Sequence, residues 1–142
     1  MSNPKLAALP IALAAIAMFS GCQTSPTRGG SSDSDIVKKR AEQRWAYLIE
    51  KKVEKAYPYL TPGYRKTKEL QQYIAEKTSV ALRWKRATST NAECEEDVCT
   101  VFISLDYEVT LPNTGGKPID TFAPLREKWV KVGTQWYFLP DK

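Results

Sequence analysis

Three cysteines and the absence of histidine define the side-chain chemistry open to this chain of 142 residues. The cysteines are Cys22, Cys94 and Cys99. Without histidine the chain has no Ser-His-Asp or Cys-His catalytic group, and no zinc site that needs an imidazole ligand. It also has no glycine-rich phosphate-binding loop of either common type. The chemistry that remains open to the chain is therefore that of its cysteines, and no cofactor or metal is expected.

Cys22 follows an apolar segment of the kind that directs export. A positively charged start precedes an apolar run over residues 6–19. This run is too short to span a bilayer comfortably and has the length of a signal-peptide core. The small residues Ser20 and Gly21 stand directly before the cysteine. The sequence predicts a signal peptide over residues 1–21, and an ordinary secretory signal cleaved nearby is the alternative.

The segment Phe19-Ser20-Gly21-Cys22 resembles the lipobox of bacterial lipoproteins, with Phe19 where leucine is usual. The resemblance implies that the Cys22 thiol takes a diacylglyceryl group and that the mature protein begins there. Several acyl chains, palmitate among them, would hold the protein firmly in a membrane. Gln23 stands where lipoproteins of this kind that stay in the inner membrane tend to have aspartate. The expected location is therefore the cell envelope, anchored in the outer membrane and facing the periplasm.

Residues 22–34 are expected to form the lipidated cysteine and a flexible tether, because serine, glycine and threonine bury too little apolar area to become ordered. The formal net charge of the whole chain is +5. Export argues against nucleic acid as the partner of this basic chain. The remaining interpretations of the positive charge are a solvated basic surface, contact with an anionic lipid, or an acidic partner.

Cys94 and Cys99 are the two cysteines that remain after lipidation of Cys22. The oxidising periplasm favours a disulfide. Two thiols with no further ligand make a poor metal site, and acidic neighbours do not activate a redox thiol. A two-residue turn at Glu96-Asp97 would place the two cysteines opposite each other, and a four-residue loop is the alternative. We expect a structural disulfide that fixes the hairpin register.

Hydrophobic periodicity predicts helices in the first half of the domain. Apolar residues recur at helical spacing over residues 35–57, which predicts one long amphipathic helix with its cap and acidic first turn at residues 33–35. A second, shorter helix is predicted over residues 66–77, with Thr67 as its cap.

The second half of the domain has the period of two that is typical of strands. The expected strands cover residues 80–85, 101–111, 119–132 and 135–139, the third being broken near Pro124. Turn residues separate them, so neighbouring strands are expected to pair as hairpins. The sequence predicts an α+β domain over residues 35–142, in which a long N-terminal helix and a short second helix pack on a curved four-stranded antiparallel sheet.

Two segments resemble the nuclear-transport-factor-two-like superfamily, the cone-shaped fold shared with ketosteroid isomerase. They are residues 54–65 (EKAYPYLTPGYR) and the closing residues 127–137 (EKWVKVGTQWY). The likeness is closest to uncharacterised exported members of the superfamily. Because this superfamily includes enzymes, binding proteins and adaptors, the fold alone does not decide the function.

The resemblance implies a conical pocket between the helices and the concave face of the sheet. The aromatic candidates for its wall are Trp45, Tyr57, Tyr64, Trp84, Tyr107, Trp129 and Trp136. The alternative for each of them is a place in the core. We expect a non-enzymatic domain that binds a hydrophobic small ligand or an envelope protein, with a homodimer left open.

The alternative function is an isomerase-like or dehydratase-like enzyme that uses a pocket carboxylate or tyrosine for proton transfer. Asp106 and Glu108 alternate with the apolar residues of their strand, so they are expected to face solvent. Asp120 and Glu127 cannot be placed from the sequence.

A third interpretation uses positive charge. Arg83, Lys85 and Arg86 lie on the first expected strand and at its end. They could contact anionic lipid head groups, and the alternative is a solvated outer face.

Overall fold

The computed structural model describes residues 32–112 and 115–141. The predicted signal peptide, Cys22 and most of the predicted tether therefore lie outside the described residues. In chain order the elements are α1 (Asp33–Ile49), α2 (Val53–Ala56), the 3₁₀ helix η1 (Tyr57–Tyr59), α3 (Pro62–Thr67), α4 (Leu70–Thr78), β1 (Arg83–Glu95), β2 (Val98–Thr110), β3 (Pro118–Val132) and β4 (Gln135–Leu139).

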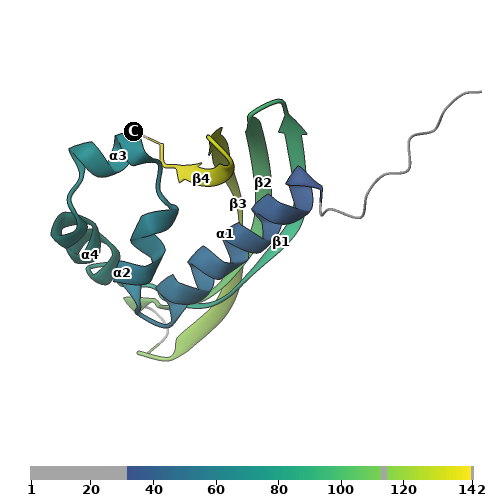
Figure 1. Cartoon of the computed structure of the whole chain (residues 1–142). Helices are drawn as coiled ribbons and strands as arrows, with labels where there is room; N and C mark the ends of the chain where they lie inside the picture. The colour runs from purple at the N-terminus through teal and green to yellow at the C-terminus, as the bar shows by residue number, and fades with distance from the viewer. Residues whose placement is uncertain (1–31, 113–114, 142) are drawn as a thin grey trace, which may run out of the picture.

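The predicted α+β class is confirmed: the helices pack on a single four-stranded antiparallel sheet with the order β1-β2-β3-β4. Figure 1 shows α1 lying along β1 and β2, with α2, α3 and α4 grouped beyond its C-terminal end. The connection between η1 and α3 reaches β4, where the N–H of Thr61 donates to the carbonyl of Phe138 at 2.9 Å. None of the helices in the described part of the chain is long and apolar enough to span a bilayer.

The long helix predicted over residues 35–57 is divided into α1, α2 and η1. Its start lies earlier than predicted, because the Ser32 side chain caps the first turn. Its break lies at Lys51, which has a φ of +61°, in the left-handed region that often ends helices. Val53 and Ala56 are still buried beyond the break. The apolar spacing therefore continued through a turn that the periodicity could not reveal.

The second helix predicted over residues 66–77 is also two helices. Thr67 is the last residue of α3 and not the cap of the next helix. Lys68 has extended backbone and separates the two helices. Glu69 and Gln72 then form a capping box that starts α4, with each side chain bonded to the other residue's backbone.

The strands follow the predicted pattern more closely. The buried residues of β2 that face the helices are Cys99, Val101, Ile103 and Leu105. β1 spans Arg83–Glu95, so the predicted strand over residues 80–85 starts too early and ends ten residues too soon. β2 begins at Val98, before the predicted residue 101. β3 continues through Pro124 without the predicted break. Because β4 pairs only with Lys128–Val132, β3 is an edge strand at Pro124, where a proline nitrogen can face away from the ladder.

The β1–β2 hairpin has the tight turn that the cysteine spacing allowed. Cys94 pairs with Cys99 and Glu95 with Val98, which leaves Glu96 and Asp97 as a two-residue turn. The two cysteines form a disulfide with a Cα–Cα distance of 4.0 Å. The two-residue alternative is therefore the one found.

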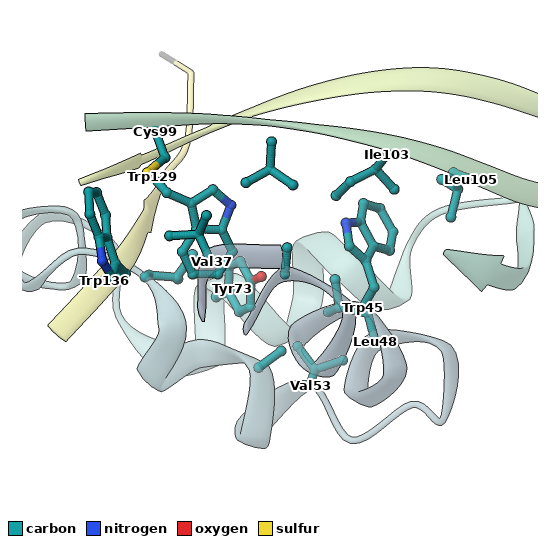
Figure 2. Packing of buried hydrophobic residues seen from close by; sticks show 14 residues of the cluster. Val37, Trp45, Leu48, Val53, Tyr73, Cys99, Ile103, Leu105, Trp129 and Trp136 are labelled. Carbon is teal, nitrogen blue, oxygen red and sulfur yellow. The ribbon is translucent and has the colours of Figure 1, made fainter. Parts of the chain in front are cut away.

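One hydrophobic core joins the helices to the sheet (Figure 2). Its largest fully buried side chains are Trp129, Trp136 and Tyr73. Within the described part of the chain, the buried hydrophobic residues extend from Val37 in α1 to Trp136 in β4.

Candidate functional site

A charged pair lies inside this core. Arg44 of α1 and Glu127 of β3 are 3% and 4% exposed, and Nη1 of Arg44 donates to Oε1 of Glu127 at 2.8 Å. Burial of a charged group is costly unless it is paired and hydrogen-bonded. Each side chain therefore depends on the other for its place in the core.

Two tryptophans complete the environment of the Glu127 carboxylate. The indole nitrogen of Trp45 donates to Oε1 at 2.8 Å, and that of Trp129 donates to Oε2 at 3.1 Å. The guanidinium carbon of Arg44 lies 4.0 Å from the centre of the Phe138 ring. Both oxygens of Glu127 are thus engaged by donors. The carboxylate thereby holds the Arg44 guanidinium and both indoles in place.

A half-open cavity of about 300 Å³ lies against this pair, lined by residues of α1, α3, α4, β3 and β4 and of the segment after β4. Its lining residues are Arg44, Trp45, Tyr64, Tyr73, Glu76, Lys77, Leu125, Arg126, Glu127, Phe138, Pro140 and Asp141. This volume is at the lower end of the range for small-molecule sites.

Two buried polar atoms of the cavity residues have no hydrogen-bond partner within the described part of the chain. They are the hydroxyl of Tyr73, a side chain only 1% exposed, and Nε of Arg44. Figure 2 shows both Tyr73 and Trp45 within the core between the helices and the sheet. A third such atom in the described part of the chain, Nε of Arg65, belongs to a residue that does not line the cavity. Buried polar groups in native proteins are nearly always hydrogen-bonded, so each of these atoms needs a reason.

The rim of the cavity carries a paired charge cluster. Glu76 on α4 forms ion pairs with Lys68 and Lys77. Hydrogen bonds first from Lys68 and then from Lys77 hold the pKa of Glu76 below its ordinary value. Glu76 is therefore ionised at neutral pH and already engaged by neighbouring lysines.

The seven aromatic residues predicted for the pocket wall are distributed over several places. Trp45 and Tyr64 line the cavity. The other five do not. The Tyr57 hydroxyl donates to the backbone carbonyls of Arg65 and Lys68. Trp84 packs edge-on against Trp45, and Tyr107 lines a separate hollow on the sheet. Trp129 and Trp136 are fully buried.

The basic residues at the start of β1 are matched by acidic residues of the neighbouring strands. The ion pairs are Arg83 with Glu108 at 3.6 Å, Lys85 with Asp120 at 2.8 Å and Arg86 with Asp106 at 2.7 Å. All three carboxylates are candidates for proton transfer in the enzyme alternative. They lie on the sheet away from the 300 Å³ cavity, so they do not line it.

Wider hollows among the described residues lie outside this cavity. One of about 910 Å³ is lined by Glu93, Glu95, Glu96, Val98 and Thr100 beside the hairpin turn. Another of about 570 Å³ contains the ion pairs of Lys85 and Arg86. Two more, of about 540 and 460 Å³, lie beside the start of α1 and β4 and over β1, β2 and β3. None of these four is lined by a described residue with an unsatisfied buried side-chain atom. Over residues 32–112 and 115–141, no group of three histidine, cysteine or acidic side chains could hold a metal ion.

Sequence reasoning did not select Arg44 or Tyr73 and left Glu127 unplaced. A signal for Arg44 exists in the sequence. Arg44 lies three residues after Ala41 and four before Leu48, on the stripe of α1 that faces the core. A charged residue on a buried stripe requires a buried partner, but only the tertiary structure identifies that partner as Glu127.

Two tyrosines allow a matched test of the unpaired hydroxyl. Tyr57→Phe is expected to lower the free energy of unfolding by about 1 kcal/mol, because it removes two hydrogen bonds to carbonyls. Tyr73→Phe is expected to leave stability unchanged or to raise it by up to about 1 kcal/mol, because it removes a buried group that has no partner. Urea unfolding of the two variants measures both effects. A loss of stability in Tyr73→Phe as large as that in Tyr57→Phe would show that the Tyr73 hydroxyl is satisfied.

No protein-family model matches the chain. No curated protein matches it either.

Proposed function

We propose that this chain is a bacterial lipoprotein whose periplasmic domain binds a small molecule in the cavity beside Arg44 and Glu127. Residues 1–21 serve as the signal peptide, and lipidated Cys22 holds the protein in the outer membrane. The domain belongs to the cone-shaped class, with the cavity between the helices and the sheet. Its role is non-enzymatic.

The observation that carries the proposal is a half-open cavity of ligand size whose wall combines aromatic side chains with the buried Arg44–Glu127 pair. Small-molecule sites typically combine hydrophobic and aromatic walls with a few fixed polar groups. The engaged oxygens of Glu127 favour binding over proton transfer.

Native mass spectrometry tests the binding role. The sample is residues 23–142, which include the whole core, exported to the periplasm behind a cleavable signal without a lipobox. The native spectrum is expected to show a mass above that of the chain, and the denatured spectrum is expected to show the mass of the chain alone. The mass difference identifies the compound. Chain mass alone in both spectra, from cells grown under several conditions, would count against a tightly bound small molecule.

The anchor is tested separately at Cys22. In the full chain, Cys22→Ala is expected to abolish labelling by radioactive palmitate and to remove the mature form from the membrane fraction, because the thiol that takes the lipid is absent. The matched control is Cys94→Ala with Cys99→Ala, which should keep the label. Palmitate incorporation in Cys22→Ala, or an unlabelled wild-type chain, would contradict the lipoprotein assignment.

A further inference from the structure

We infer that a strip of tyrosine rings and cations joining α1, α2, η1 and β4 binds the surface of a membrane that contains anionic phospholipid. This ring–cation strip consists of Tyr137, Arg40, Tyr59, Tyr47 and Lys55. The inference goes beyond the binding of a small molecule. It rests on the proposed anchor at Cys22, which brings the membrane within reach of the domain.

Each member of the ring–cation strip contacts the next. The guanidinium carbon of Arg40 lies 5.9 Å from the ring centre of Tyr137 and 4.8 Å from that of Tyr59. The ring centres of Tyr59 and Tyr47 are 6.1 Å apart, and Nζ of Lys55 lies 5.9 Å from the centre of the Tyr47 ring. Lys55 is exposed and the other four residues are half-buried, so the strip forms part of the surface.

Arg40 is fixed in a way that leaves part of its guanidinium available. Its Nε–H donates to the backbone carbonyl of Trp136 at 2.8 Å, and the rings of Tyr59 and Tyr137 hold its position. Within the described part of the chain, its two Nη nitrogens make no hydrogen bond, and neither is a fully buried atom. A guanidinium with uncommitted N–H groups can bind two oxygens of a phosphate group at once. Arg40 therefore offers a preorganised contact for a lipid phosphate.

The positive charge of the strip is not balanced by ion pairs. Neither Arg40 nor Lys55 pairs with a carboxylate of the described residues. The hydrogen bond from Lys52 is the main reason that the pKa of Glu50 is lowered, and the charge of Lys55 adds a smaller effect. The strip thus complements a negatively charged surface.

Two features favour a lipid surface over an acidic protein. Tyrosine combines an apolar ring with a polar hydroxyl and is enriched where membranes meet water. The strip also lies near the point where the chain from Cys22 enters the domain: Arg40 follows Asp33, the first residue of α1, by about 10 Å along the helix.

The length of the chain before α1 sets how far the domain can move from its anchor. From Cys22 to Asp33 the backbone can extend to about 40 Å at most. An anchored domain therefore meets the membrane at high effective concentration, and a few weak contacts are enough to orient it.

Vesicle sedimentation tests the strip without the lipid anchor. Residues 23–142, which contain every described residue, are mixed with vesicles of phosphatidylcholine alone or of equal parts phosphatidylcholine and phosphatidylglycerol. The domain is expected to bind the anionic vesicles only. Binding is expected to weaken as salt is added, because salt screens charges at the surface.

Two double variants with the same loss of charge locate the contact. Arg40→Gln with Lys55→Gln is expected to weaken binding to the anionic vesicles by about fivefold for each cation removed. Lys85→Gln with Arg86→Gln is the matched control, because these cations are already paired with carboxylates on the sheet. It should bind within about twofold of the wild type, since paired cations contribute little to a surface contact. Lys55→Gln alone changes an exposed side chain and should still lose about fivefold.

Three results would overturn the inference: no binding of the wild type to anionic vesicles, unchanged binding in Arg40→Gln with Lys55→Gln, or equal weakening in the two double variants. Equal weakening would mean that net charge alone drives the binding. Binding to poly-glutamate that depends on Arg40, in a chain that ignores the vesicles, would assign the strip to an acidic protein instead. These results leave the anchor and the cavity ligand standing, because palmitate labelling and native mass spectrometry test those separately.

Discussion

Replacing Glu127 by alanine is expected to lower the free energy of unfolding by about 3–5 kcal/mol, the range for removing one member of a buried ion pair. The variant leaves the Arg44 guanidinium buried without its counterion. It also leaves the indole N–H groups of Trp45 and Trp129 without their acceptor. Urea unfolding of the purified domain, followed by tryptophan fluorescence, measures the change.

Two further variants show whether the loss comes from the buried charge. Glu95→Ala removes an exposed carboxylate of the hairpin and should change stability by less than about 0.5 kcal/mol. Arg44→Met combined with Glu127→Leu removes both charges and should be far more stable than Glu127→Ala, because well-packed apolar side chains can replace a buried ion pair. A loss below about 1 kcal/mol in Glu127→Ala would mean that Arg44 reaches water or another partner.

Replacing Cys94 and Cys99 by alanine is expected to cost about 2 kcal/mol, since closing so short a loop removes little entropy from the unfolded chain. The wild-type domain should be two hydrogen atoms lighter than its reduced formula by intact mass. Unfolding with and without dithiothreitol measures the effect: the reductant should destabilise the wild type and leave the double variant unchanged. Two freely alkylated thiols in periplasmic protein would contradict the bond.

The hairpin is the part of the fold that local sequence determines best. Cys94 and Cys99 lie on either side of a two-residue turn, and β2 alternates apolar and polar residues along its length. These features depend on neighbours a few residues apart, and a period of two has no other interpretation at this length. The number of strands and their antiparallel pairing were therefore accessible from the sequence, although the predicted first strand covered only the start of β1.

The helical half was less accessible, for a physical reason visible at Lys51. Apolar residues continue at nearly helical spacing on both sides of it because both helices bury a face in the same core. Periodicity records which side chains are buried and not whether the backbone between them turns. The turn at Lys51 and the separation at Lys68 therefore came only from the structure.

The sequence by itself determined the α+β class and the hairpin disulfide, because each depends on residue types at short spacing, and the export signal with its cysteine stays a prediction. Only the tertiary structure decided where the cavity lies and what it contains. Arg44 and Glu127 are separated by 83 positions, and Tyr73 comes from a third element. Long-range packing brings them together, and no local pattern records which buried donor is left without a partner.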